Sequence, residues 1–420
     1  MNTERCYSEA RDYYAALGGD TEAAIEKTLS LPVSLHCWQL DDVRGFEGAA
    51  ALEGGIQTTG NYPGAATNPE ELLSDMEFAL KFLPGKTRIN LHASYAIFEK
   101  GMPRADRDAL LPEHFAAWTE FAKKHGLAID FNPTFFSHPM VKDGLTLSSP
   151  DENVRAFWIR HGIACIRIAE YFARETGKQC LLNFWMPDGL KETPADRYSP
   201  RSRMADSLDR ILAAGYDKSL VAVSLESKVF GIGLESYTVG SAEFCTSYSI
   251  KNGLVPLMDN GHYHPTESVA DKISSMLLFS EKVALHVTRA VRWDSDHVTR
   301  FDDEIREIAL EIVRGGPERF FLALDYFDAS INRLAAWITG YRAFRKALLW
   351  ASVWPIKELA AAQEANDFTS VLVKSEEIKT APFSLVWAEY CRRADVPADA
   401  SWLNPVLDYE KAILPSRTNR

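Results

Sequence analysis

Short apolar runs recur along the chain and alternate with longer amphipathic segments. These runs have the length and the β-branched or aromatic content of buried strands. A strand that is apolar on both faces is typical of a parallel sheet, because helices cover both sides of such a sheet. The expected strands are SLHCWQ (34–39), RINLHA (88–93), AIDFNP (128–133), CLLNFW (180–185), VAVSLE (221–226), VPLMD (255–259), VALHVT (283–288) and FLALD (321–325).

The segments between these runs have helical spacing and recognisable ends. PEHFAAWTEFAKKHG (112–126) begins with a proline at a favourable first position and stops at a glycine. It places Phe115, Trp118 and Phe121 on one face. PEELLSDMEFALKFLPG (69–85) repeats apolar residues at the same spacing and breaks at a Pro-Gly pair.

Eight β-α units in one chain predict an α/β fold, a (β/α)8 TIM barrel, over residues 31–350. A doubly wound open sheet is the alternative, because counting strands does not show that the sheet closes. Residues 1–30 are expected to form an N-terminal helical segment. Residues 351–420 predict helices without strands, and the tryptophans in and near them favour an extension that packs on the barrel or provides oligomer contacts.

Composition narrows the functional classes. The 420 residues carry a net charge of −12, which gives no general attraction to nucleic acid or to anionic membranes. The start of the chain lacks the apolar core of a signal peptide, and no apolar run approaches the ~20 residues of a membrane span. Six scattered cysteines form no CxxC pair, as is typical of reduced thiols. We therefore expect a cytoplasmic protein.

The first β-α connection, residues 41–70, holds six glycines and two prolines and is far longer than the usual loop of about 2–6 residues. A long glycine-rich loop at the catalytic end of a barrel is a candidate lid. A disordered insertion is the alternative.

Acidic residues and histidines gather where the last four predicted strands end. In a barrel these positions converge at the C-terminal mouth, where active sites of this fold lie. Buried carboxylates are costly unless they are paired or bind a metal, so the pattern predicts divalent cations, and seven ligands indicate two of them. Mg²⁺, Mn²⁺ or Co²⁺ suits such ligands, with Zn²⁺ at a histidine-rich position. The seven are Glu226, Asp259, His262, His286, Asp294, Asp296 and Asp325.

Taken singly, several of these residues have ordinary structural interpretations. His286 on an apolar strand could be a hydrogen-bonded core residue, and Asp294 and Asp296 could cap a helix or face solvent. We expect His264 to form a local hydrogen bond and Asp328 to cap the helix after the last strand.

Other residues at the same mouth complete a site. Lys228, two residues beyond Glu226, offers a compact positive charge that can polarise a substrate oxygen, or alternatively a salt bridge to a carboxylate. His92 ends the second strand and Trp185 ends the fourth. The run FNPTFF (131–136) adds an apolar wall.

On residues alone, three functions compete. An aldose–ketose isomerase needs metals that hold adjacent sugar oxygens, aromatic walls and no organic cofactor. A metal-dependent phosphoesterase or endonuclease would use similar ligands, but it should show basic residues for phosphate, and the net charge argues against it. A metal-stabilised binding barrel would not need a lysine, an apparent lid and open metal positions together.

Longer motifs resemble one family over nearly the whole chain, that of L-rhamnose isomerase. The motifs are LPVSLHCWQ, GGIQTTGNYPG, DFNPTFFSHP, LESKVFGIGLESYTVGS, DNGHYHPTE, VRWDSDHV and LDYFDASINR. The resemblance implies a (β/α)8 barrel, a homotetramer and a two-metal aldose–ketose isomerase that converts L-rhamnose to L-rhamnulose at the start of rhamnose catabolism.

The resemblance also implies roles for individual residues. A structural divalent metal, Mn²⁺ or Zn²⁺, falls to Glu226, Asp259, His286 and Asp325. A catalytic metal, typically Mn²⁺ with Co²⁺ or Mg²⁺ as alternatives, falls to His262, Asp294 and Asp296. Lys228, His92 and Trp185 match sugar-contacting positions.

The chemistry of such an isomerase can follow two routes. Proton abstraction to an enediol needs a base that is not already a ligand, whereas a hydride shift needs polarised sugar oxygens. The carboxylates are largely committed as ligands, so we expect a metal-assisted hydride shift in which Lys228 polarises O1 and Asp325 guides the oxygen proton. The methyl group of this 6-deoxy sugar is expected to meet apolar residues of the first loop, Val43, Phe46, Leu52 and Ile56.

Overall fold

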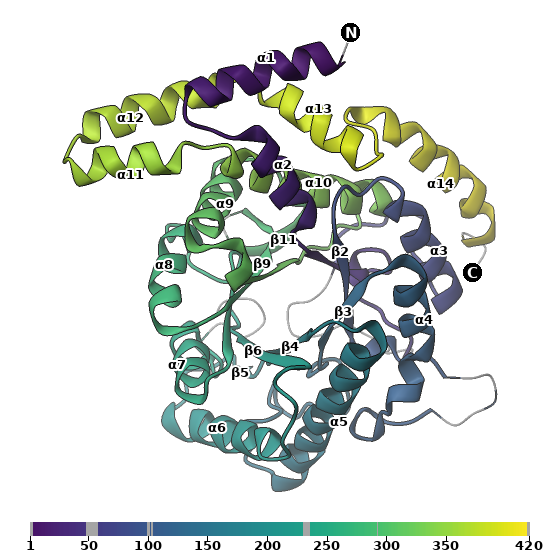
Figure 1. Ribbon diagram of the computed structural model, residues 1–420. Coiled ribbons are helices and arrows are strands. Elements are labelled where there is room, and N and C mark those ends of the chain that lie inside the picture. The colour runs from purple at the N-terminus through teal and green to yellow at the C-terminus, as the bar shows by residue number, and fades with distance from the viewer. Residues whose placement is uncertain are drawn as a thin grey trace.

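Within the described residues, eight parallel strands close into one barrel. The computed structural model describes residues 3–47, 58–98, 101, 104–229, 236–291 and 293–417 (Figure 1). Strand β1 pairs with β2 on one side and with β12 on the other, so the sheet is closed and the open-sheet alternative is wrong. The barrel strands, in order around the barrel, are β1 (Val33–His36), β2 (Thr87–His92), β3 (Ala128–Asn132), β4 (Cys180–Trp185), β6 (Val221–Glu226), β8 (Val255–Asp259), β9 (Val283–Val287) and β12 (Phe320–Leu324).

Every predicted run forms a barrel strand. The predicted and observed bounds differ most at the end of the first strand. Strand β1 stops at His36, and the next three residues form the 3-10 helix η1 (Cys37–Gln39). The Gln39 side chain explains this turn, because it bonds the backbone of Asp328 in both directions. Its Nε2 donates to the Asp328 carbonyl at 3.0 Å, and its Oε1 accepts from the Asp328 N–H at 2.8 Å.

A ring of helices covers the outside of the barrel, one after each barrel strand (Figure 1). Asn68 accepts from the Glu71 N–H at 2.9 Å at the start of α3, and Gly126 ends α4 with a φ of 66°. The helix predicted from Pro112 begins as a 3-10 turn before α4. The ring is α3 (Pro69–Leu80), α4 (Ala116–His125), α5 (Glu152–Thr176), α6 (Tyr198–Leu212), α7 (Ala242–Asn252), α8 (Val269–Phe279), α9 (Asp303–Gly315) and α10 (Arg333–Ser352).

One helix cap differs from the expectation, and the cap of a second helix removes an alternative interpretation of Asp294 and Asp296. Helix α10 is capped by Asn332, whose Oδ1 accepts from the Ala335 N–H at 2.8 Å. Asp328, the predicted cap, instead accepts from the Ser330 N–H at 2.8 Å in a local turn. Helix α9 is capped by Asp302, so its cap does not need Asp294 or Asp296.

Helices from both ends of the chain gather on one side of the barrel (Figure 1). Helix α1 packs against α13 and α2 packs against α10. The C-terminal region is helical as predicted, and Arg417 ties it to the barrel shell by binding Asp75 of α3. Among the described residues, none of the helices is both long and apolar enough to cross a membrane. The terminal helices are α1 (Thr3–Ala16), α2 (Thr21–Ser30), α11 (Ile356–Glu364), α12 (Phe368–Glu377), α13 (Phe383–Arg393) and α14 (Leu403–Arg417).

Candidate active site

Four of the predicted ligands meet at the C-terminal mouth of the barrel. Glu226 and Asp259 are the last residues of β6 and β8, His286 lies near the end of β9, and Asp325 follows β12. Each offers one ligand atom, and these atoms all lie within 4.8 Å of one another. The parallel register brings them together, because Asp259 and His286 are direct partners across β8 and β9. The cluster could hold a metal ion.

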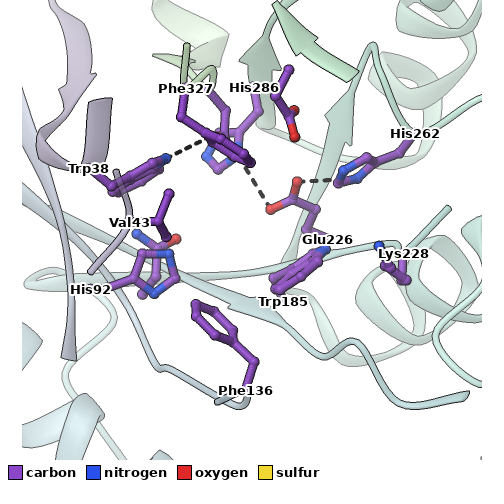
Figure 2. Close-up of a pocket in the computed structure, with 13 residues that line it drawn as sticks. Trp38, Val43, His92, Phe136, Trp185, Glu226, Lys228, His262, His286 and Phe327 are labelled. Atoms are coloured by element: carbon purple, nitrogen blue, oxygen red, sulfur yellow. Dashed lines mark hydrogen bonds and ion pairs between the residues drawn. The ribbon is translucent and has the colours of Figure 1, made fainter. Parts of the chain in front are cut away.

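Neighbouring side chains fix the orientation of these carboxylates (Figure 2). His286 Nδ1 lies 3.3 Å from Glu226 Oε2 and 3.4 Å from Asp325 Oδ2. Asn183 of β4 donates to Glu226 Oε2 at 2.6 Å, and Trp38 Nε1 donates to Asp325 Oδ1 at 2.9 Å. Such outer contacts orient metal ligands in proteins.

The electrostatics of the cluster are dominated by carboxylates packed around one imidazole. Burial opposes the charged form of His286, but the charges and hydrogen bonds of Glu226 and Asp325 raise its pKa well above 6.5. Burial raises the pKa of Asp325, but His286 and other neighbours lower it to about 2. His286 Nε2 is buried and has no hydrogen-bond partner among the described residues. The nitrogen beside the carboxylates is His286 Nδ1, and this nitrogen with the carboxylate oxygens fits a divalent cation, which would take the place of the proton on His286.

The second predicted ligand set is only partly described. His262 and Asp296 line the same pocket as the cluster, and His262 Nδ1 lies 3.3 Å from Glu226 Oε1. The side chain of Asp294 lies outside the described residues. Asp296 belongs to a hairpin of β10 (Arg289–Val291) and β11 (Trp293–His297), where a plain loop was expected. Its φ of 40° is uncommon for a residue with a side chain, and such conformations often lie at functional sites.

A pocket opens above the cluster, and all three predicted substrate-contacting residues line it. Lys228 is buried, and its Nζ lies 5.4 Å from the centre of the Trp185 ring. Burial lowers the pKa of His92 to about 3, so this imidazole is neutral at ordinary pH. The pocket is lined by Trp38, Val43, His92, Asn132, Phe136, Trp185, Glu226, Lys228, His262, His286, Asp296, Asp325 and Phe327.

The residues predicted to come from the first loop divide into three groups. Val43 lines the pocket, as expected. Phe46 does not line it, because its ring packs against Tyr95 and Trp118, with centroid distances of 5.4 and 6.4 Å. Leu52 and Ile56 lie outside the described residues.

Several residues of the site were not predicted from the sequence. Asn183 carried a usable signal, because an amide inside the apolar strand CLLNFW must find a hydrogen-bond partner when buried. Asn132 carried the same signal in the strand AIDFN, whereas Trp38 and Phe327 carried none. His264 behaves as expected, since its Nδ1 lies 2.8 Å from Thr266 Oγ1 in an exposed local contact.

Comparisons with known proteins point to one family. A family model described as L-rhamnose isomerase (RhaA) matches residues 1–417. The L-rhamnose isomerase of Mannheimia succiniciproducens is 49% identical over 416 residues, which cover 99% of each chain. That of Pectobacterium atrosepticum is 48% identical over 416 residues, 99% of this chain and 98% of the other. A solved L-ribulose 3-epimerase overlaps with a TM-score of 0.47 at 13% identity, over 79% of this chain and 97% of that one.

Proposed function

The chain belongs to the L-rhamnose isomerase family, and we propose that it interconverts L-rhamnose and L-rhamnulose by a metal-assisted 1,2-hydride shift. The observation that carries this proposal is the buried cluster of Glu226, Asp259, His286 and Asp325 beneath a pocket that holds Lys228. A reaction that moves a carbonyl between adjacent carbons needs the carbonyl oxygen and the hydroxyl oxygen to be held and polarised at one place. These two oxygens would be polarised by a cation at the cluster and by the ammonium group of Lys228.

The chain offers residues for two divalent ions. Glu226, Asp259, His286 and Asp325 would hold a structural ion, Mn²⁺ or Zn²⁺. His262, Asp294 and Asp296 would hold the catalytic ion, Mn²⁺ with Co²⁺ or Mg²⁺ as alternatives. A divalent cation bound there supplies Lewis acidity to neighbouring sugar oxygens.

The other pocket residues bind and orient the sugar. Lys228 would place its ammonium group at O1, where negative charge grows as the hydride moves. Trp185 Nε1 is buried without a hydrogen-bond partner within the described part of the chain, so it would donate to a sugar hydroxyl. His92 is neutral and would exchange a hydrogen bond with the sugar without a change in charge. Val43 would face the methyl group on C5 of the sugar.

The state of the titratable groups supports the hydride shift over an enediol route. An enediol requires a base near C2. Asp325 is assigned as a metal ligand and His286 holds its pKa low, and burial lowers the pKa of His92, so neither group is suited to be that base. The ionised carboxylate of Asp325 would instead accept a hydrogen bond from the hydroxyl whose proton moves between O1 and O2. Asp325 thereby has a positional role in the proton transfer as well as a role as ligand.

We also propose a cytoplasmic homotetramer whose subunits meet through the helical extension, as the family resemblance implies. Every side chain of α12 is at least partly exposed, and Phe368, Leu372 and Val373 have exposed fractions of 58%, 64% and 53%. Light scattering after size-exclusion chromatography should give the mass of four chains, and Leu372→Glu should lower it. A monomeric wild-type protein would contradict the proposal.

An aldose-to-ketose assay across a small sugar panel, with metal analysis of the same sample, tests the function. L-rhamnose should be converted fastest, and absence of its turnover by metal-loaded protein would overturn the proposal. L-rhamnose deuterated at C2, run in ordinary water, should carry its label to C1 of the product. Extensive washout of deuterium at low conversion would keep the isomerase but replace the hydride shift by proton abstraction.

A further inference from the structure

Two consecutive residues in the loop after η1 have a left-handed backbone conformation. Asp42 has a φ of 59° and Val43 a φ of 62°. For a β-branched residue this conformation is a steric outlier, because the side chain crowds the adjacent backbone. Val43 is buried, and its side chain lies beside Trp38 and His92, across the pocket from Lys228 (Figure 2). A glycine could adopt this φ without strain, so the chain retains a side chain here at a cost.

A buried ion pair holds the strained segment from the other side. Arg333, the first residue of α10, donates from Nε to Asp42 Oδ1 at 2.7 Å and from Nη2 to Asp42 Oδ2 at 2.8 Å. Its third nitrogen, Nη1, donates to the Tyr62 carbonyl at 2.7 Å and the Pro63 carbonyl at 3.2 Å. One guanidinium therefore fixes residues near both ends of the first β-α connection to the start of a barrel helix.

The backbone around Asp42 is bonded as well. The Val43 N–H donates to the Trp38 carbonyl at 3.0 Å, and Thr58 Oγ1 donates to the Asp42 carbonyl at 3.2 Å. Asp41 Oδ2 accepts from the Gly45 N–H at 2.8 Å. An unfavourable backbone conformation persists only when its surroundings hold it in this way, and such conformations concentrate at ligand sites.

We propose that Asp42 and Arg333 are positioning residues that hold Val43 in its left-handed conformation and thereby set the preference for a methyl group over a hydroxymethyl group on the sugar. This inference rests on the proposed function. With C1 and C2 at the ligand cluster and Lys228, the far end of the sugar reaches the opposite wall, where Val43 lies. A hydroxyl placed against the valine methyl groups loses its hydrogen bonds to water and gains no partner.

The test compares kcat/KM for L-rhamnose with kcat/KM for L-mannose, which carries a hydroxyl on C6. Val43→Ala should reduce the preference for L-rhamnose about tenfold, the usual scale for one or two methyl groups. Asp42→Asn should reduce this preference to a similar extent. Arg333→Lys cannot form two parallel hydrogen bonds to the carboxylate, so its preference should lie between those of Asp42→Asn and wild type. The double variant Asp42→Asn/Val43→Ala should lose no more than either single variant, because both changes act through one side chain.

Asp75→Asn is the matched control. Asp75 also forms a buried two-pronged pair, with Arg417 nitrogens at 2.8 and 2.9 Å, and it does not line the pocket. This variant should lower the melting temperature by a similar amount to Asp42→Asn and leave the sugar preference unchanged. Full preference in Asp42→Asn, together with a loss in Val43→Ala, would overturn the positioning role.

A stability measurement checks the strain without any assay of turnover. At an ordinary position glycine is less stabilising than alanine, because it gives the unfolded chain more freedom. At residue 43 the glycine variant should be at least as stable as the alanine variant, because glycine adopts the left-handed conformation without strain. The melting temperature of Val43→Gly should therefore equal or exceed that of Val43→Ala. The control pair at Val154, buried in helix α5, should keep the ordinary order. If the alanine variant melts at a higher temperature than the glycine variant at both positions, the strain argument is overturned. A wild-type protein that is inactive on both sugars would overturn the proposed function alone.

Discussion

Buried charges are paired one to one near the N-terminal end of the barrel, whereas carboxylates are in excess at the C-terminal mouth. Near the N-terminal end, Arg88 of β2 binds Asp130 of β3 one to one, with N···O distances of 2.8 and 2.5 Å. The remaining groups are bonded too, because Arg88 donates to the Gln179 carbonyl and Asp130 accepts from the Leu181 N–H. At the C-terminal mouth, Glu226, Asp259 and Asp325 gather around the imidazole of His286, and His262 Nδ1 lies 3.3 Å from Glu226 Oε1. A balanced pair needs no further partner, whereas a cation would neutralise the excess negative charge of the cluster, as the proposed metal site requires.

Metal removal should give the largest effect, because it acts on the unbalanced end alone. Treatment with a chelator is expected to lower kcat/KM by about a thousandfold or more, the worth of several kcal/mol of charge stabilisation. Restoring Mn²⁺ at about 100 times its dissociation constant should raise the free energy of unfolding by about 2.7 kcal/mol. Both are measured on one sample by assay and by thermal melting. An exhaustively demetallated enzyme with full activity would contradict this difference between the ends.

One substitution at each end should sharpen the contrast. Arg88→Met leaves Asp130 buried without its partner, and it is expected to lower the free energy of unfolding by about 3–5 kcal/mol while the folded protein keeps its kcat/KM. Glu226→Gln should abolish activity but cost the metal-free protein less stability than Arg88→Met, because the lost attraction to His286 is partly offset by the lost repulsion among the carboxylates. Denaturant titration with and without Mn²⁺ measures both. Equal stability losses in the two metal-free variants would show that the mouth is balanced after all.

Asp41 is a third kind of buried carboxylate, one that is neither paired with a cation nor part of a metal cluster. Burial raises its pKa from 3.8 to about 7, although hydrogen bonds from Tyr95 and Gly45 oppose the shift. Between these pH values the unfolded chain releases a proton that the folded chain retains, so stability falls as pH rises. The slope is at most about 1.4 kcal/mol per pH unit.

Denaturant titrations at several pH values between 4 and 8 should therefore show a steeper decline for wild type than for Asp41→Asn. The asparagine variant loses a hydrogen bond at every pH, so the comparison uses the slopes and not the absolute stabilities. Parallel slopes would mean that Asp41 is ionised in the folded protein. In that case Asp41 would resemble Asp130, whose charge is stabilised by its neighbours in the folded protein.

The sequence predicts the barrel well because its strands are buried on both faces and stand out as apolar runs. It also predicts that Glu226, Asp259, His286 and Asp325 converge, since the end of a strand is a defined place in a closed barrel. It does not predict where β1 ends, because the Gln39 side chain finds its partner in a distant loop. The hairpin that carries Asp296 is hidden because its strands, RAV and WDSDH, have only three and five residues and contain no long apolar run.

The contacts that orient the proposed metal ligands are equally hidden in the sequence, because a tryptophan that bonds to a proposed ligand resembles one that bonds to a structural partner. Trp38 Nε1 donates to Asp325 Oδ1, whereas Trp118 Nε1 donates to the backbone carbonyl of Tyr95, and both distances are 2.9 Å. Only the three-dimensional structure separates the two roles.

The smallest predicted effect follows from this pair of tryptophans. Trp38→Phe keeps an aromatic ring in the pocket but removes the donor to Asp325, so the carboxylate is less firmly oriented. We expect a roughly tenfold weaker dissociation constant for Mn²⁺, about 1.4 kcal/mol, by isothermal titration calorimetry. Trp118→Phe is the control, and it should lower the melting temperature without a change in Mn²⁺ affinity. Equal Mn²⁺ affinities in the two variants would show that Trp38 acts only as a wall of the pocket, and that the cluster at the mouth is oriented without it.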